Sequence, residues 1–253
     1  MTISIIVVTF NSAATLRTTF DGILRQDYGE CEVIVVDGMS TDGTEGIIRE
    51  YEPLFGGRMK WVSEPDGGIY DAMNKGLDMA MGDVVGFLNS DDFFTGDDAL
   101  RTIAEALNAD AQVDAVYGDV HYVRRDDTTR VVRYYSSKVF SRRLMRFGFM
   151  PAHTTFYCRR ELWEKYDITY RVAADFELLL RMIYVREIRT KYIPKDFVTM
   201  RTGGASSSGA ASHIQINRDH LRALEANGVR SNIFLLSLRY LYKLSEFIRR
   251  GNI

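Results

Sequence analysis

The chain is poor in cysteine and has no excess of positive charge, and each shortage excludes a class of protein. Its two cysteines, Cys31 and Cys158, lie far apart and fit neither a zinc-site spacing nor a disulfide framework. A reducing compartment is the simpler interpretation. The 32 basic residues do not outnumber the 34 acidic ones, and the net charge of −2 argues against a nucleic-acid partner.

Long apolar runs are also missing. No uncharged stretch reaches the roughly 18 to 20 residues that a membrane-spanning helix needs. The first apolar run, 3–10, is short and has no basic region before it, so we expect no secretory signal. These features predict a cytosolic protein, or one that is bound to a membrane without crossing it.

The first third of the chain alternates buried strands with helices. Nearly continuous β-branched runs such as "ISIIVVTF" (3–10) are typical of strands that are buried on both faces of a parallel sheet. The expected strands are 3–10, 32–37, 59–64 and 83–88, and the helices between them end near residues 26, 51 and 81. Such alternation predicts βαβ units, whose ligands bind at the carboxyl ends of the strands. Asp37, Glu64 and Asp91 each follow a strand, so we expect three acids to converge on one crevice.

The second half has a mixed pattern without a long linker. The expected elements are helices at 97–109, 175–185, 213–227 and 231–250, strands at 113–118 and 154–158, a hairpin over 121–135 and a flexible loop at 203–212. The hairpin is closed by Asp126, Asp127 and Thr128, which are good turn formers.

Two adjacent acids in "FLNSDDFF" (87–94) need a positive partner or a turn. Asn-Ser-Asp-Asp is good turn chemistry, which is one explanation of Asp91 and Asp92. The other is a divalent cation, since Mg²⁺ or Mn²⁺ typically takes only one or two protein carboxylates and completes its shell with water and phosphate oxygens.

Several motifs in the right order resemble family 2 glycosyltransferases with the GT-A fold. These are "SIIVVTFNSAATL" (4–16), "VIVVDGMSTDGT" (33–44) and "VSEPDGGIYDAMNKGLDMAMGDVVGFLNSDD" (62–92), with a weaker match around 151–181. The chain is especially similar to the subgroup that builds bacterial O-antigen and capsule repeats. The resemblance implies an α/β fold with a Rossmann-like, mostly parallel central sheet flanked by helices.

The resemblance also divides the chain. It implies a nucleotide-sugar-binding half over 1–118 and an acceptor-binding half of the same domain over 119–201. Residues 202–253 then form a flexible loop and C-terminal helices.

The nucleotide contacts are carried over residue by residue. Thr9 and Asn11 match the turn that touches the nucleoside, and Asp37 matches the acid that hydrogen-bonds the uracil ring. The segment beside the nucleotide is matched by Asp66, Asn74 and Lys75. For Lys75, an exposed ion pair with Asp71 is the alternative.

Asn89-Ser90-Asp91-Asp92 matches the metal-binding acidic motif, with Asn89 in place of the usual first acid. The resemblance implies a Mn²⁺ or Mg²⁺ ion at Asp91 and Asp92, with Asp91 facing the ribose and Asp92 the metal.

Asp175 in "ADFELLLR" matches the catalytic base of the family. Read alone, it is an N-cap of a helix. Glu177 is either a residue that orients the acceptor or a solvated helix residue. His153 is either part of the acceptor pocket or a histidine satisfied by its neighbours. Two further hypotheses concern the loop at 201–212 and the residue after it. Arg201 would lie near the diphosphate, and His213 would be a metal ligand that follows the flexible loop. The alternative is a plain loop without either role.

The last helix, 231–250, carries Arg239, Lys243 and Arg250 against one acid, Glu246, with apolar residues on its other faces. Such a helix can lie on an anionic membrane surface. Packing against the domain, or a contact within a homodimer, explains the same pattern.

Together these features predict an inverting, metal-dependent transferase. It would move a sugar from a nucleotide-sugar, best matched by a UDP-sugar, to a saccharide acceptor linked to a lipid diphosphate. Two other classes stay open. A sugar-phosphate nucleotidyltransferase would normally show a Gly-rich basic loop after the first strand, which "TFNSAATLR" (9–17) does not supply. A non-catalytic nucleotide-sugar-binding scaffold would bind the donor without turnover.

Overall fold

The computed structural model describes residues 1–203 and 209–248, and the side chains of residues 1–203 and 214–240. In this part of the chain nine strands form one sheet, in the order β3-β2-β1-β4-β8-β6-β9-β5, with β7 paired to β6. The strands are β1 (Ile3–Thr9), β2 (Cys31–Asp37), β3 (Met59–Ser63), β4 (Val84–Phe87), β5 (Phe93–Phe94), β6 (Ala115–Val123), β7 (Val131–Tyr135), β8 (Tyr157–Arg159) and β9 (Thr190–Arg201).

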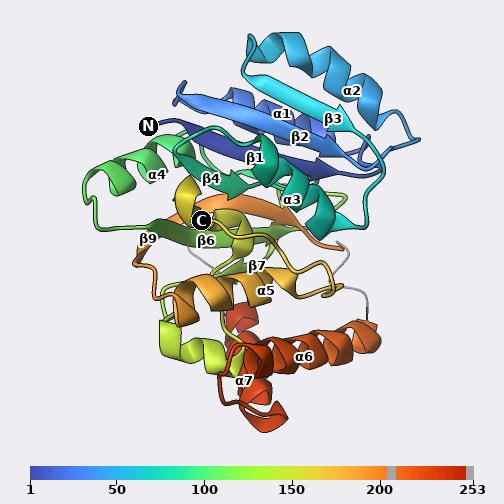
Figure 1. Cartoon of the computed structure of the whole chain (residues 1–253). Helices are drawn as coiled ribbons and strands as arrows, with labels where there is room; N and C mark the ends of the chain where they lie inside the picture. The colour runs from blue at the N-terminus through green and yellow to red at the C-terminus, as the bar shows by residue number, and fades with distance from the viewer. Residues whose placement is uncertain (204–208, 249–253) are drawn as a thin grey trace.

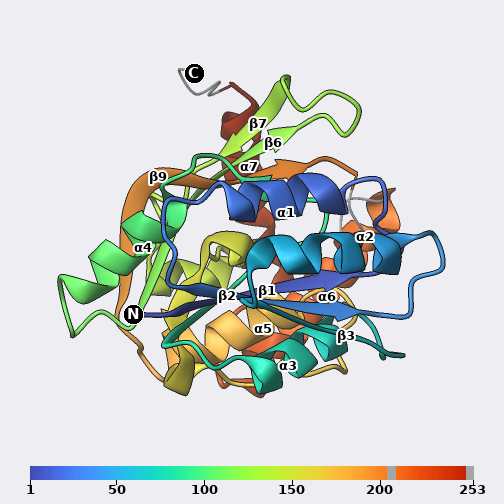
Figure 2. The same cartoon turned by 90° about the horizontal axis from the view of Figure 1, so that it is seen from above.

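Helices cover both faces of this sheet (Figures 1 and 2). They are α1 (Leu16–Leu24), α2 (Thr44–Tyr51), α3 (Ile69–Met79), α4 (Ala99–Asn108), α5 (Ala174–Leu179), α6 (Gly209–Ala226) and α7 (Ile233–Ile248). A wider π-helical segment, Leu180–Val185, extends α5. Short 3₁₀ turns span Glu52–Phe55, Arg142–Phe147, His153–Thr155 and Arg160–Leu162.

The β-branched runs form strands because both of their faces are buried. Along β1, Ile5 and Val7 belong to a core shared with α1, α2 and α4, whereas Ile6 and Val8 belong to a second core shared with α3, α5, α6 and α7. Successive side chains on a strand point to opposite faces, so a strand between two helical layers must be apolar at nearly every position. The four N-terminal strands predicted from the sequence are confirmed.

The carboxyl ends of the parallel strands lie in register. Thr9 at the end of β1 is opposite Asp37 at the end of β2, and Asp37 is opposite Ser63 at the end of β3. The segments that follow these strands therefore start from one edge of the sheet, where ligands of open α/β sheets bind.

The second half completes the sheet with mostly antiparallel pairings. β8 lies between β4 and β6 and is antiparallel to both, and β6 and β7 form the predicted hairpin. The mixed α/β fold confirms the predicted fold class. Several details differ from prediction: 154–158 is mostly a 3₁₀ turn followed by β8, and β5 and β9 were not expected. Of the flexible loop predicted at 203–212, residues 209–212 belong to α6 and residues 204–208 lie outside the described residues.

β9 escapes sequence analysis because it contains a proline and a bulge. Its pairing with β6 shifts in register around Pro194, between Tyr192 and Asp196. Proline lacks a backbone N–H and is tolerated inside a sheet at such irregular positions. Gly118 of β6 faces this bulge, and a Cβ there would lie 2.5 Å from the Lys195 carbonyl oxygen.

The two predicted C-terminal helices are present, but the expected basic face of α7 is not fully exposed. Arg239 is buried and donates hydrogen bonds to Asn217 Oδ1 at 2.7 Å and to the Gly148 carbonyl oxygen at 3.3 Å. The side chains of Lys243 and Arg250 lie outside the described residues. Among the residues described, no helix is both long enough and apolar enough to span a bilayer.

Candidate active site

Hydrogen bonds join the loops that follow β1, β2 and β4. The Asn11 backbone N–H donates to Ser40 Oγ at 2.7 Å, and Asn11 Oδ1 accepts from the Thr41 N–H at 2.9 Å. The Ser12 and Ser90 hydroxyls lie 2.8 Å apart. Asn11 has a φ of 48°, a left-handed conformation that asparagine tolerates better than most residues. These loops therefore form one connected rim.

Asp37 lies fully buried inside this rim. Its carboxylate accepts hydrogen bonds from Ser40 Oγ at 2.5 Å, Ser40 N at 3.1 Å and Ser63 Oγ at 2.6 Å. Beside it, the hydroxyl of Thr9 is buried and has no partner among the described residues. A buried polar group without a partner is costly, so the Thr9 hydroxyl is the one polar group of this pair that the described residues leave without a hydrogen bond.

Asp66 belongs to the same group of residues. A Cβ at Gly38 would lie 2.6 Å from Asp66 Oδ2, so the loop after β3 presses against the residue that follows Asp37. Asp66 Oδ1 accepts from the Gly68 N–H at 2.8 Å, which fixes the turn into α3. Glycine at position 38 permits this close approach.

Asn74 and Lys75 are occupied by contacts within the protein. The amide of Asn74 donates to the Tyr166 carbonyl oxygen at 3.0 Å and accepts from the Tyr166 N–H at 2.8 Å. Lys75 Nζ lies 2.8 Å from Glu64 and 3.9 Å from Asp71. Of the three acids expected in the crevice, Glu64 is thus neutralised by Lys75.

Arg201 provides the positive charge beside the acidic motif. Its guanidinium donates to the Asp91 carbonyl oxygen, and its backbone N–H donates to Asp92 Oδ1 at 3.2 Å. Asp92 Oδ2 accepts from Asn89 Nδ2 at 3.0 Å. The last residue of β9 therefore fixes both aspartates of the loop that follows β4.

Burial dominates the charge state of this loop. Asp92 is 1% exposed, and its burial, followed by the charge of Asp91, raises its pKa to about 8. Burial also lowers the pKa of Arg201, while both aspartates oppose that effect. The pair of aspartates is undercompensated, and an additional cation stabilises such a pair.

The residues present fit a divalent cation. Within the described chain no cluster of three or more potential side-chain ligands occurs, but Mg²⁺ and Mn²⁺ sites beside phosphates typically use one or two carboxylates. The two aspartates satisfy that number. Asn89 Oδ1 is a buried amide oxygen without a partner in the described residues, which adds a hard oxygen beside them.

Asp175 lies in the first turn of α5 (Figure 1). The N-cap of this helix is Ala173, so the interpretation of Asp175 as the cap residue is wrong. Its Oδ1 accepts from the Phe176 N–H at 2.8 Å and lies 3.3 Å from the Tyr70 hydroxyl, which donates to the Val172 carbonyl oxygen at 2.6 Å.

The environment of Asp175 suits a base. Burial raises its pKa to about 6, and the hydrogen bonds from Phe176 and Tyr70 limit that rise. Efficient general bases have a pKa near the working pH. Tyr70 follows the turn that contains Asp66, so it joins Asp175 to the rim.

Glu177 and His153 are both held by neighbouring side chains. Glu177 is buried and forms an ion pair with Arg181 at 2.8 Å, so the interpretation of Glu177 as a solvated helix residue is wrong, and its role in orienting the acceptor stays a prediction. His153 Nε2 lies 2.6 Å from the Tyr166 hydroxyl, and burial lowers its pKa to about 4, which keeps it neutral. The side chain of His213 lies outside the described residues.

Sequence analysis missed four residues that complete the site: Ser40, Ser63, Tyr70 and Tyr166. A signal existed only for Ser40, because serine three residues after an aspartate is typical of a local side-chain turn. The others depend on contacts between distant segments.

This arrangement of loops and acids on a mixed α/β sheet defines a GT-A glycosyltransferase. Residues 4–167 match the family described as Glycosyl transferase family 2. The "PGL/p-HBAD biosynthesis glycosyltransferase" of Mycobacterium bovis is 30% identical over 239 residues, which cover 92% of this chain and 89% of that protein. An uncharacterized glycosyltransferase of Mycobacterium tuberculosis is 35% identical over 192 residues, covering 74% and 70%. The chain belongs to glycosyl transferase family 2.

Solved structures share the fold. TarS 1-349 of S. aureus in complex with UDP-GlcNAc superposes with a TM-score of 0.71 at 21% identity, covering 99% of this chain and 72% of that chain. This chain spans 65% of the TarS chain solved with UDP. The mannosyltransferase PcManGT from Pyrobaculum calidifontis, in complex with GDP-Man and Mn2+, gives a TM-score of 0.62 at 19% identity and coverages of 96% and 79%.

Proposed function

We propose that the protein is an inverting, metal-dependent glycosyltransferase that uses a UDP-sugar and a lipid-linked saccharide acceptor. One observation supports the proposal. Hydrogen bonds join the loop after β1 to the acidic loop after β4, and Tyr70, at the start of α3, contacts Asp175, whose pKa burial raises to about 6. UDP-GlcNAc, GDP-Man and Mn2+ are bound by structures of the same fold, which supports a nucleotide-sugar and a metal.

The donor side follows from the rim. Asp37 and the unpartnered hydroxyl of Thr9 bind the uracil ring, and Asp91 binds the ribose. Asp91 and Asp92 would hold the divalent cation, whose charge would stabilise the diphosphate as a leaving group. The guanidinium of Arg201 adds positive charge at the same place.

The chemical step uses Asp175. Its carboxylate accepts the proton of the acceptor hydroxyl while the hydroxyl oxygen forms a bond to the anomeric carbon. The bond from that carbon to the diphosphate oxygen breaks, and UDP leaves with the electron pair. Attack from the face opposite the nucleotide inverts the anomeric centre.

For the acceptor we propose a chemical class and not a specific molecule. Several mycobacterial relatives are named for PGL/p-HBAD biosynthesis, and the motifs resemble enzymes of bacterial O-antigen and capsule synthesis. Both support a lipid-linked acceptor in the synthesis of a bacterial surface glycan. Attachment to the cytoplasmic membrane surface is supported by Ile233 and Phe234 at the start of α7, which are 53% and 70% exposed.

Donor hydrolysis tests the proposal. Purified protein is incubated with UDP-, GDP- and dTDP-sugars in Mn²⁺, Mg²⁺ or EDTA, and nucleotide release is measured. We expect slow release from a UDP-sugar that stops in EDTA and is lost in Asp92→Asn. The exposed Asp97 provides the matched control, because Asp97→Asn removes an equal charge far from the rim.

Release that persists in EDTA would refute the role of the metal. Metal-dependent donor binding without turnover, with or without an acceptor, would identify a nucleotide-sugar-binding scaffold instead. Retention of anomeric configuration in the product would refute the inverting mechanism.

A further inference from the structure

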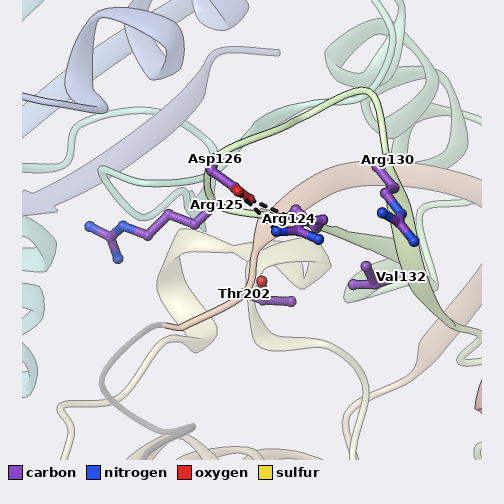
Figure 3. A pocket seen from close by; sticks show the side chains of 6 residues that line it. All are labelled: Arg124, Arg125, Asp126, Arg130, Val132 and Thr202. Carbon is purple, nitrogen blue, oxygen red and sulfur yellow. Dashed lines mark hydrogen bonds and ion pairs between the residues drawn. The ribbon is translucent and has the colours of Figure 1, made fainter.

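A pocket rich in arginine lies at the tip of the β6–β7 hairpin (Figure 3). It has a volume of about 370 Å³ and is open to solvent. Its walls come from the hairpin and from the residue that follows β9. The lining residues are Arg124, Arg125, Asp126, Arg130, Val132 and Thr202.

The pocket carries excess positive charge. Arg124 is held by Asp126 through two hydrogen bonds of 2.9 Å. Neither Arg125 nor Arg130 forms an ion pair with any residue that the structure describes. The lining therefore holds three guanidinium groups and one carboxylate, and that carboxylate is paired with Arg124. Guanidinium groups match phosphate oxygens geometrically and bind them through paired, charge-assisted hydrogen bonds.

The pocket lies next to Arg201 of the candidate active site in the chain and in the sheet. Val123 pairs with Arg201 in the sheet, and the Thr202 N–H donates to the Val123 carbonyl oxygen at 2.9 Å. The pocket thus begins one residue beyond the arginine that contacts Asp91. Arg125 extends away from Arg124 and Arg130 in Figure 3, and its charge is close enough to Arg201 to lower the pKa of that residue.

The donor does not account for these arginines. The loops that form the donor site follow β1, β2, β3 and β4, and none of them lines the pocket. Five of its six lining residues come from 119–201, the half of the chain that the resemblance assigns to the acceptor, and Thr202 follows that half directly. A phosphate group beside the acceptor would satisfy the two unpaired guanidinium groups.

We propose that Arg125, Arg130 and Thr202 bind the phosphate or diphosphate through which the acceptor saccharide is attached to its lipid. This inference rests on the proposed function and names the chemistry of its acceptor. Two phosphate sources share that chemistry, the acceptor's own linkage and the headgroups of an anionic membrane, and the proposal commits to the first.

Paired acceptors test the assignment. One carries the saccharide on a short prenyl diphosphate, and the other carries the same saccharide on a neutral alkyl chain. In Arg125→Gln/Arg130→Gln we expect the KM for the diphosphate acceptor to rise tenfold or more, because each removed contact is a hydrogen bond between charged groups. The KM for the neutral acceptor should stay as in the wild type.

Two matched variants control for charge. Arg25→Gln removes an exposed arginine that pairs with Asp97, and it should leave both KM values unchanged. Asp126→Asn frees Arg124 without adding bulk, and it should tighten the binding of inorganic pyrophosphate, measured by calorimetry in EDTA. Looser binding in Asp126→Asn would overturn the proposal.

Vesicles separate the two phosphate sources. If the double variant loses binding to anionic phospholipid vesicles while its KM for the diphosphate acceptor is unchanged, the pocket contacts the membrane and the assignment to the acceptor is wrong. Donor hydrolysis is measured in parallel. Wild-type hydrolysis with no pyrophosphate binding refutes only this inference, whereas absence of donor hydrolysis and transfer refutes the proposed function.

Discussion

Replacing Asp175 with asparagine should stabilise the protein while it removes activity. In the folded protein the pKa of Asp175 is raised from 3.8 to about 6 by burial. Because the folded state then holds this proton more tightly than the unfolded state, stability falls as the pH rises from about 4 to about 6. At 1.36 kcal/mol for each pKa unit, the charged carboxylate costs the fold at most about 3 kcal/mol at pH 7. Asparagine avoids that cost and keeps an oxygen for the Phe176 N–H and the Tyr70 hydroxyl.

Urea unfolding of the wild type and Asp175→Asn measures this effect. We expect the variant to be more stable at pH 7 by about 1–3 kcal/mol, with little difference at pH 4. Sugar transfer should fall by about 10²- to 10⁴-fold, and the wild-type kcat/KM should rise as the pH increases through about 6. Two outcomes would refute the reasoning that a buried, charged Asp175 destabilises the fold. One is equal stability of the two proteins at pH 7, and the other is a variant that is stabilised at pH 4 as much as at pH 7.

Three other substitutions test the environments of named groups. Asp92→Asn should abolish Mn²⁺-dependent nucleotide release without lowering the melting temperature, since the raised pKa of about 8 leaves Asp92 mostly uncharged at pH 7 and asparagine is a neutral group of the same size; release at the wild-type rate would contradict the metal role. Glu177→Gln should destabilise the fold by about 1–3 kcal/mol in urea unfolding, because it removes the more deeply buried of the two carboxylates, Glu177 and Glu164, that pair with Arg181. A raised acceptor KM with unchanged stability would instead favour a contact with the acceptor. Gly86→Ala places a Cβ 2.2 Å from the ring of Tyr157, so a loss of at least about 1–3 kcal/mol is expected, and an unaltered unfolding midpoint would show that β4 and β8 can move apart.

The sequence carries most of the information about the N-terminal half. Segments such as 3–10 and 32–37 are buried on both faces, so their composition alone indicates their place between two helical layers. Once those strands are parallel, the convergence of Asp37 and Asp91 at one edge follows from the topology. Their chemical environment does not follow, because Ser63 and Arg201 reach them from other strands.

The second half is harder to predict because its contacts are distant in sequence. β8 has three residues and β9 contains Pro194, so neither shows the pattern of an ordinary strand. Helical spacing predicts which side chains of α7 share a face, but it cannot show what covers that face. Arg239 lies beneath Asn217 and Gly148, which a helical wheel does not include.

The position of β8 between β4 and β6 has a consequence for synthesis on the ribosome. β4 is buried along its whole length, and the strand that covers its free edge, Tyr157–Arg159, is made some seventy residues after it. Until those three residues emerge, a nascent chain that has formed β1 to β4 exposes an apolar sheet edge, the type of surface that recruits other strands. Premature termination anywhere before Tyr157 should therefore yield chains that need chaperones or aggregate, even though the whole nucleotide-binding sequence has been translated.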